Sequence, residues 1–198
     1  MSRTTILAMG VAVATILAGF SASAQTKQQP TDRQPSNQQS TSQKQTPGSA
    51  PSAISKSDQR FVTEAIQTDL AEVEIGKLAQ QKSDNPDAKQ FGQMLEQDHS
   101  QHLQQAKQLA QQIGVTPPSE PKPEQKAIYD KLSKLSGPSF DKQFAAAMVK
   151  AHKEDIVKFQ KVAKEKPPVG EFASQTVPIL QKHLQTAEAL ATTRQSKK

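Results

Sequence analysis

The chain has 198 residues, of which 34% are hydrophobic, and it contains no cysteine. Without cysteine it can form neither disulfides nor thiolate metal sites. The formal net charge is +6, but Arg3 and the net +3 of each of the segments 25–56 and 194–198 leave −1 for residues 57–193. A near-neutral folded part argues against a nucleic-acid surface, although the basic ends could bind weakly to anionic membranes or envelope polymers.

Residues 1–24 have the pattern of a secretory signal peptide. A basic residue, Arg3, precedes an apolar run from Ile6 to Phe20, and the small residues Ala22-Ser23-Ala24 follow it as a cleavage pattern. The apolar run is too short to favour a membrane span. We therefore expect cleavage near Ala24-Gln25 and a periplasmic or secreted protein.

Residues 25–56 consist mainly of Gln, Ser, Thr, Pro and Lys. Such a segment buries too little apolar surface to offset the entropy lost on ordering, so it is predicted to be a disordered tether. At the other end, residues 194–198 form a short basic tail. The folded domain is therefore expected over residues 57–193.

Apolar residues recur at helical spacing throughout that domain and predict an all-α fold. A short helix is expected over residues 124–135, and four long helices over residues 57–82, 86–113, 139–164 and 170–193. Four long amphipathic helices without a strand pattern are typical of a four-helix bundle. The short helix lies in the connection between the second and third long helices.

Turn and capping residues set the expected helix boundaries. Ser55 or Ser57 can cap the first long helix, and Asn85-Pro86 is a typical start for the second, which Gly114 should end. Pro178 lies inside the last helix. It predicts either a kink or a helix that starts afresh at Pro178.

The helical period also assigns faces. In the first helix, Glu74 and Leu78 fall opposite the apolar stripe that carries Phe61 and Ile66. In the last helix, Ile179 falls on the inner stripe. In the short helix, Ile128, Leu132 and Leu135 are aligned on one face.

Four polar residues fall on or beside the inner stripes at one height. Each lies about thirteen residues from a helix end, which corresponds to roughly 20 Å at 1.5 Å per residue. One carboxylate and three imidazoles are therefore expected to meet at mid-bundle: Glu72, His99, His152 and His183.

Two interpretations of this group remain open. It could bind one transition-metal ion such as Zn, Fe, Mn or Cu, with Asp98 and Asp155, and Asp69 as a further candidate, orienting the imidazoles. It could instead be a metal-free hydrogen-bond network that fixes helix register. His102, one turn from Asp98, is expected to hydrogen-bond to that carboxylate. A di-iron site would need more inward-facing carboxylates.

Six short segments between residues 57 and 191 resemble the bacterial domain of unknown function 4142 family in order and spacing. They are Phe61-Val-x-x-Ala65, Leu70-Ala-Glu-Val-Glu-x-Gly-Lys-Leu-Ala79, Met94-x-x-x-Asp98-His99, Leu135-Ser-Gly-x-x-Phe140-Asp141, Met148-Val-x-x-His152 and Pro178-x-Leu-x-x-His183-Leu184. The resemblance implies an exported, ferritin-like four-helix bundle whose motif residues are Glu72, His99, His152 and His183. It implies no settled activity.

From these features we expect a stress-protective binding protein that holds a metal ion or small ligand, without a catalytic residue. The alternative is a structural or interaction protein of the cell envelope. A metal-dependent oxidoreductase would in addition need an open coordination position and a substrate path. Metal binding through neutral imidazoles should weaken as the pH falls through about 6.5. The sequence indicates neither a partner nor an oligomeric state.

Overall fold

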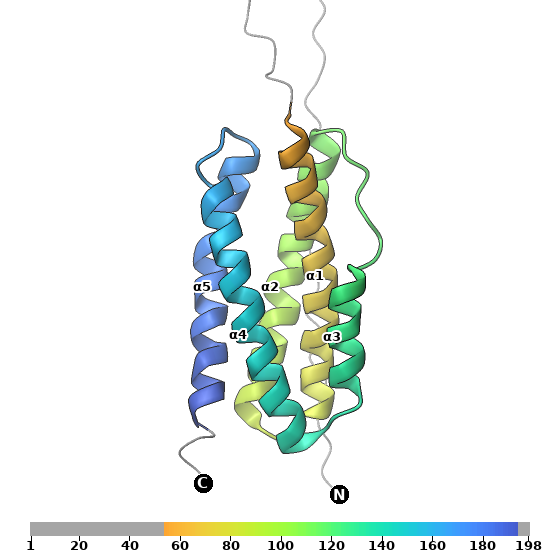
Figure 1. The fold of residues 1–198 in the computed structure, drawn as a ribbon, viewed down its shortest axis with the longest axis vertical. Helices are drawn as coiled ribbons and strands as arrows, with labels where there is room; N and C mark the ends of the chain where they lie inside the picture. The colour runs from red at the N-terminus through yellow and green to blue at the C-terminus, as the bar shows by residue number, and fades with distance from the viewer. Residues whose placement is uncertain (1–53, 194–198) are drawn as a thin grey trace, which may run out of the picture. The chain divides into compact units, whose positions relative to one another are not determined.

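A computed structural model describes residues 54–193, which form five helices and no strand (Figure 1). The all-α prediction is confirmed, and every helix boundary lies within two residues of the expected one. The predicted signal peptide, most of the tether and the basic tail lie outside the described residues. The helices are α1 (Lys56–Lys82), α2 (Pro86–Gln112), α3 (Pro123–Ser133), α4 (Gly137–Val162) and α5 (Val169–Thr193).

The capping residues act as the sequence predicts. Ser55 begins α1 with a capping box, in which its hydroxyl accepts from the amide of Asp58 at 3.1 Å and its own amide donates to the Asp58 carboxylate at 3.3 Å. Asn85 caps α2 by accepting from the amide of Asp87 at 3.0 Å. Gly114 follows α2 with a φ of 74°, the left-handed conformation that ends helices at low cost for glycine.

Pro178 lies within a continuous α5, so the prediction that a helix starts afresh there is wrong. Proline removes the hydrogen bond that its amide would have donated to the carbonyl of Ser174. Both residues are exposed, and water can therefore satisfy that carbonyl. Packing of the buried Ala173 and Leu180 on either side holds the helix together across the break.

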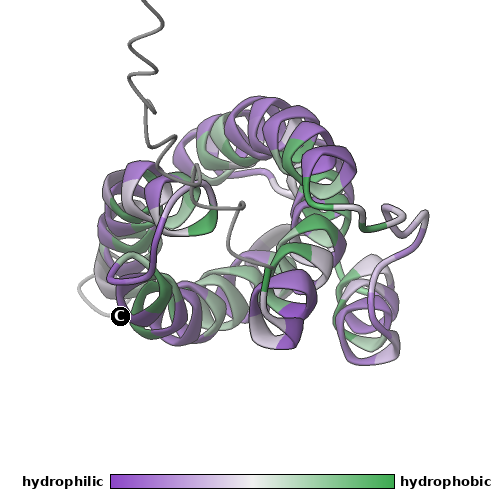
Figure 2. Cartoon of the chain, turned by 90° about the horizontal axis from the view of Figure 1, so that it is seen from above, coloured by the Kyte–Doolittle hydropathy of each residue, from purple (hydrophilic) through white to green (hydrophobic). Residues whose placement is uncertain are grey.

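The long helices run alongside one another and turn their apolar faces toward a shared interior (Figure 2). α1 is antiparallel to α2 and α4 is antiparallel to α5, whereas α4 runs parallel to α2 (Figure 1). The connection from α2 to α4 must therefore cross the length of the domain, and it carries α3 on the outside of α1 and α4. Within residues 54–193, no helix has the length and hydrophobicity of a membrane span.

The short helix α3 explains one wrong assignment of faces. Leu78 was expected on the outer side of α1, but it is buried in the same apolar cluster as Leu132 of α3. Because α3 covers this side, α1 is buried on two faces. Ile128 and Ile179 were expected on the apolar faces of their helices, but both side chains are exposed.

Two apolar clusters fill the interior, one at each end. The first contains Phe91, Phe144 and Met148, and the second contains Phe61, Phe159 and Leu180. A buried polar layer lies between them on the four long helices. We call this layer the polar belt, and it consists of Asp69, Glu72, His99, His102, His152, Thr176 and His183.

A close approach of two glycines sets the register of α1 against α2. A Cβ atom at Gly76 would lie 2.6 Å from the carbonyl oxygen of Gly92 and 2.8 Å from the amide nitrogen of Glu96. These are backbone atoms that cannot move independently of the helix. The contact lies one turn from Glu72, so it also fixes the distance between α1 and α2 at the polar belt.

We predict that Gly76→Ala destabilises the fold. In an isolated helix, alanine is favoured over glycine by about 1 kcal/mol, but overpacking against backbone should cost roughly 1–3 kcal/mol and reverse the sign. Urea unfolding measures the difference, and Glu74→Ala, at an exposed position of the same helix, is the control. A Gly76→Ala variant as stable as the wild type or more stable would contradict the close approach.

Candidate metal centre

Three histidines from three helices meet in the polar belt. His99 of α2, His152 of α4 and His183 of α5 each offer one ring nitrogen, and these nitrogens all lie within 4.8 Å of one another. The Nε2 atom of His152 is 3.2 Å from the Nδ1 atom of His183. All three side chains are buried, with exposures of 4%, 1% and 0%. We call this group the histidine cluster.

The outward-facing nitrogen of each ring contacts an oxygen atom. The contacts are His99 Nδ1 to Asp69 Oδ1 at 2.9 Å, His152 Nδ1 to the Met148 carbonyl at 3.0 Å, and His183 Nε2 to Asp98 Oδ2 at 2.8 Å. Carbonyl and carboxylate oxygens accept hydrogen bonds, so each of these ring nitrogens carries a proton. In a neutral imidazole the other nitrogen then holds a lone pair, and these are the nitrogens that converge.

Convergent lone pairs are the arrangement that a cation satisfies. The Nε2 atom of His99 is buried without a hydrogen-bond partner. With protons assigned to the outward nitrogens, Nε2 of His152 and Nδ1 of His183 are both acceptors, and they lie 3.2 Å apart. Zinc–nitrogen bonds of about 2.0–2.1 Å in a tetrahedral site place two ligand nitrogens about 3.4 Å apart, close to the separation of this pair. The cluster therefore fits a metal ion that imidazoles bind.

Burial keeps two of the rings neutral. It lowers the pKa of His152 to about 3, and the neighbouring His99 and His183 act in the same direction. Burial likewise lowers the pKa of His183 to about 4, helped by His99 and opposed by Asp98. At neutral pH neither ring needs to lose a proton before it can bind a metal.

The third ring lies among carboxylates. Burial alone would lower the pKa of His99, but its hydrogen bond to Asp69 and the charges of Glu72 and Asp155 raise the pKa above 6.5. Burial raises the pKa of Glu72 to about 7, opposed by His99. Glu72 lies outside the histidine cluster, and its Oε2 atom is buried without a hydrogen-bond partner. Burial also raises the pKa of Asp155.

The carboxylates expected to orient the rings have different surroundings. Asp98 holds His183, and Asp69 holds His99. Asp155 interacts with His99 through its charge, and within residues 54–193 no hydrogen bond joins it to the histidine cluster. Asp69 was only the third candidate, although its position on the inner stripe of α1 could have ranked it higher.

His102 has a different partner from the one expected. Its Nδ1 atom lies 2.9 and 2.8 Å from the two carboxylate oxygens of Asp69, and its Nε2 atom lies 2.9 Å from the Thr176 hydroxyl. The predicted hydrogen bond to Asp98 is therefore wrong, because Asp98 turns toward α5 and His183. The spacing of seven residues between Thr176 and His183 places both on one face.

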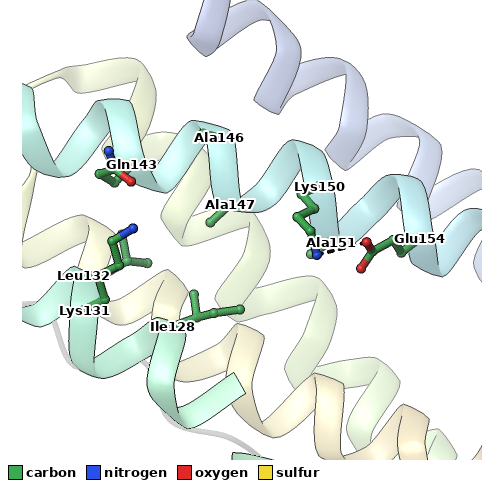
Figure 3. Close-up of a pocket in the computed structure, with 9 residues that line it drawn as sticks. All are labelled: Ile128, Lys131, Leu132, Gln143, Ala146, Ala147, Lys150, Ala151 and Glu154. Atoms are coloured by element: carbon green, nitrogen blue, oxygen red, sulfur yellow. Dashed lines mark ion pairs between the residues drawn. The ribbon is translucent and has the colours of Figure 1, made fainter. Parts of the chain in front are cut away.

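A surface groove between α3 and α4 is separate from this site (Figure 3). It has a volume of about 370 Å³ and contains Ile128, Leu132 and Ala147 together with the ion pair of Lys150 and Glu154 at 2.9 Å. None of the polar-belt residues lines it. The candidate chemistry therefore lies inside the domain.

Fold and site define an all-helical protein with a buried histidine cluster. The profile of the domain of unknown function DUF4142 matches residues 43–190, so the chain belongs to this family. A solved structure, the crystal structure of a DUF305 fragment from Deinococcus radiodurans, is similar with a TM-score of 0.63 and 16% identity. The match covers 69% of this chain and 96% of that one, and it supports the fold alone. No curated protein matches the chain.

The pKa of His152 predicts an acid-dependent loss of stability. Unfolded His152 takes up a proton below pH 6.5, whereas the folded ring does so only near pH 3. As the pH is lowered from 6.5 to about 3, the free energy of unfolding should therefore decrease by about 1.4 kcal/mol per pH unit because of this residue. His152→Phe, measured by urea unfolding of chelator-treated protein, should make the decline shallower by that amount. Parallel curves for wild type and variant would contradict a buried neutral ring.

Proposed function

We propose that this protein is an exported, ferritin-like four-helix bundle that binds one transition-metal ion through His99, His152 and His183, with Glu72 as the fourth donor. The signal-peptide pattern of residues 1–24 supports export. Four long helices with a lengthwise connection, and the similarity to the DUF305 fragment, support the ferritin-like description. Holding a metal ion in the cell envelope would serve protection against metal stress.

The observation that carries this proposal is the direction of the ring nitrogens. Three imidazoles donate outward to oxygen atoms, so their other ring nitrogens turn inward, with lone pairs on His152, on His183 and on the neutral form of His99. Two of these lone pairs are 3.2 Å apart, and the pKa values of about 3 and 4 leave no proton between them at neutral pH. Mutually facing acceptors repel each other, and a metal cation turns this repulsion into three bonds.

The donor set narrows the choice of metal. Imidazole nitrogen suits Zn, Cu and Fe, whereas Mn prefers carboxylates and water. Glu72 would supply a negative charge beside a divalent ion, and its carboxyl would then have to lose its proton. The near-complete burial of the three rings favours retention of an ion over turnover of a substrate, which needs an open position and a path. We therefore assign no reaction.

A second function is favoured by a different part of the belt. Asp69, His102 and Thr176 satisfy one another through hydrogen bonds without any ion. Such a network can fix the register of α1, α2 and α5 in a protein whose role is structural or that interacts with envelope partners. The two functions differ in whether the wild type responds to metal.

Metal retention by the purified protein distinguishes the metal-binding function from the structural one. The chain purified without chelator or affinity tag should contain about one metal ion, by elemental analysis. A ligand present at 100 times its dissociation constant should stabilise the fold by about 2.7 kcal/mol. His152→Ala should lose both the ion and the metal-dependent rise in melting temperature.

Ser83→Ala is the matched control for that experiment. Ser83 is buried and its hydroxyl donates to Asp141, away from the polar belt, so its loss should destabilise the fold and leave metal binding intact. Metal binding would be refuted, and the structural function favoured, if the wild type contains no metal and its melting temperature does not change when Zn, Cu, Fe or Mn is added.

The pKa values predict how many protons the metal displaces. His152 and His183 are neutral down to about pH 3 and 4, so they should release none near neutral pH. Only His99, with its raised pKa, and Glu72, at about 7, should release protons, which makes two at most. Affinity should therefore begin to weaken above pH 6.5 as the pH falls.

Calorimetric titration in buffers of different ionisation enthalpy counts these protons. Glu72→Gln should reduce the number by about half a proton at pH 7, because Glu72, with a pKa of about 7, is half protonated there and an amide carries no titrating proton. Release of three or more protons by the wild type would show that His152 or His183 is charged in the metal-free protein. That result would remove the basis for the facing lone pairs of His152 and His183.

A further inference from the structure

A second buried group lies one turn from the histidine cluster and touches none of its ligand nitrogens. It comprises Asp69 of α1, His102 of α2 and Thr176 of α5, with exposures of 1%, 6% and 4%. Metal binding as proposed above uses none of these side chains directly. Burying a carboxylate, an imidazole and a hydroxyl is costly unless each is paired, so their arrangement needs a physical account.

Asp69 connects this group to the metal ligands. Its Oδ1 atom lies 2.9 Å from the Nδ1 atoms of both His99 and His102, and its Oδ2 atom lies 2.8 Å from Nδ1 of His102. A carboxylate accepts hydrogen bonds, so both rings donate their Nδ1 protons to it. Consequently Asp69 fixes the proton of the neutral His99 ring on Nδ1 and leaves its Nε2 lone pair facing the cluster.

His102 is itself held at both ends and on one face. Its Nε2 atom is 2.9 Å from the Thr176 hydroxyl, whose oxygen also lies 2.8 Å from the carbonyl oxygen of Phe172 one turn earlier. The Phe172 ring stacks on the imidazole with centroids 4.6 Å apart and an interplanar angle of 21°. The His102 ring therefore cannot rotate without breaking contacts on two helices, and neither can the Asp69 carboxylate that it holds.

We propose that His102 and Thr176 are positioning residues for the metal site, acting through Asp69 to fix the ring orientation and tautomer of His99. This inference rests on the proposed function for its effect on metal affinity, but the tautomer of His99 can be measured without metal. The other two ligands lack such a device, since a backbone carbonyl orients His152 and the partly exposed Asp98 orients His183. His99 is the ligand whose orientation depends on a further imidazole.

His102→Phe is the direct test, because a phenyl ring can keep the stacking on Phe172 while it removes both hydrogen bonds. Loss of a partner that orients a metal ligand typically reduces affinity by 10–100-fold, so Zn²⁺ affinity, measured by competition with a chelating dye, should fall within about that range. In the metal-free protein at alkaline pH, nitrogen-15 chemical shifts should show the His99 proton on Nδ1 in the wild type and a mixture of tautomers in the variant.

Two further variants keep the test decisive. Thr176→Val removes the hydrogen bond at Nε2 of His102. It should lower Zn²⁺ affinity and mix the His99 tautomers to a smaller extent, and it can be measured even if His102→Phe fails to fold. Ser83→Ala, which removes the buried hydrogen bond to Asp141, should destabilise the fold without changing Zn²⁺ affinity or the His99 tautomer. A merely structural role of His102 would make its variants behave like Ser83→Ala.

The outcomes for this inference and for the proposed function are distinguishable. If the variants at 102 and 176 keep wild-type affinity and the Nδ1 tautomer of His99, the positioning role is refuted while metal binding stands. If the wild type binds no Zn²⁺, metal binding fails and the nitrogen-15 shifts alone decide. A change of tautomer in the variants then upholds the positioning role, and an unchanged tautomer refutes it.

Discussion

The burial of a polar belt between two apolar clusters is the constraint on which the rest of this structure depends. Each unpaired buried group would cost about 1–3 kcal/mol, so the helices must meet at heights where the groups find partners. Asp69 of α1 contacts two rings of α2, and a slip of either helix by one turn would lose both contacts. The close approach of Gly76 and Gly92 imposes the same register by sterics alone.

The same burial that costs stability prepares the histidine cluster for a metal. Apolar residues above and below the belt exclude water, and the low pKa values of His152 and His183 are the direct result. His99 differs because Asp69, Glu72 and Asp155 lie around it and favour its charged form. One half of the site is therefore neutral and the other half acidic, which suits a divalent cation better than either half alone.

Sequence reasoning succeeded where a feature depends on residues close in the chain or on the constant rise of a helix. Capping residues act within one turn, so Ser55 and Asn85 marked helix starts, and the constant rise per residue brought the three histidines together. It failed where packing against a neighbouring helix determines the partner or the burial of a side chain. Both Asp98 and Asp69 could reach His102, and only the packing of α5 turns Asp98 away. Leu78 is buried in the apolar cluster that contains Leu132 of α3, which the pattern of α1 alone cannot reveal.

The two halves of the belt differ in how their hydrogen bonds balance, and this difference bears on function. In the group of Asp69, His102 and Thr176, the carboxylate, both ring nitrogens and the hydroxyl each have a hydrogen-bond partner, as in a network that only fixes register. In the histidine cluster two acceptors, Nε2 of His152 and Nδ1 of His183, face each other, and the buried Nε2 of His99 has no hydrogen-bond partner among residues 54–193. A purely structural role would explain the first group but would gain nothing from the second. A cation is the partner that turns such acceptors into bonds, so the unmatched half of the belt is the part that points to a ligand.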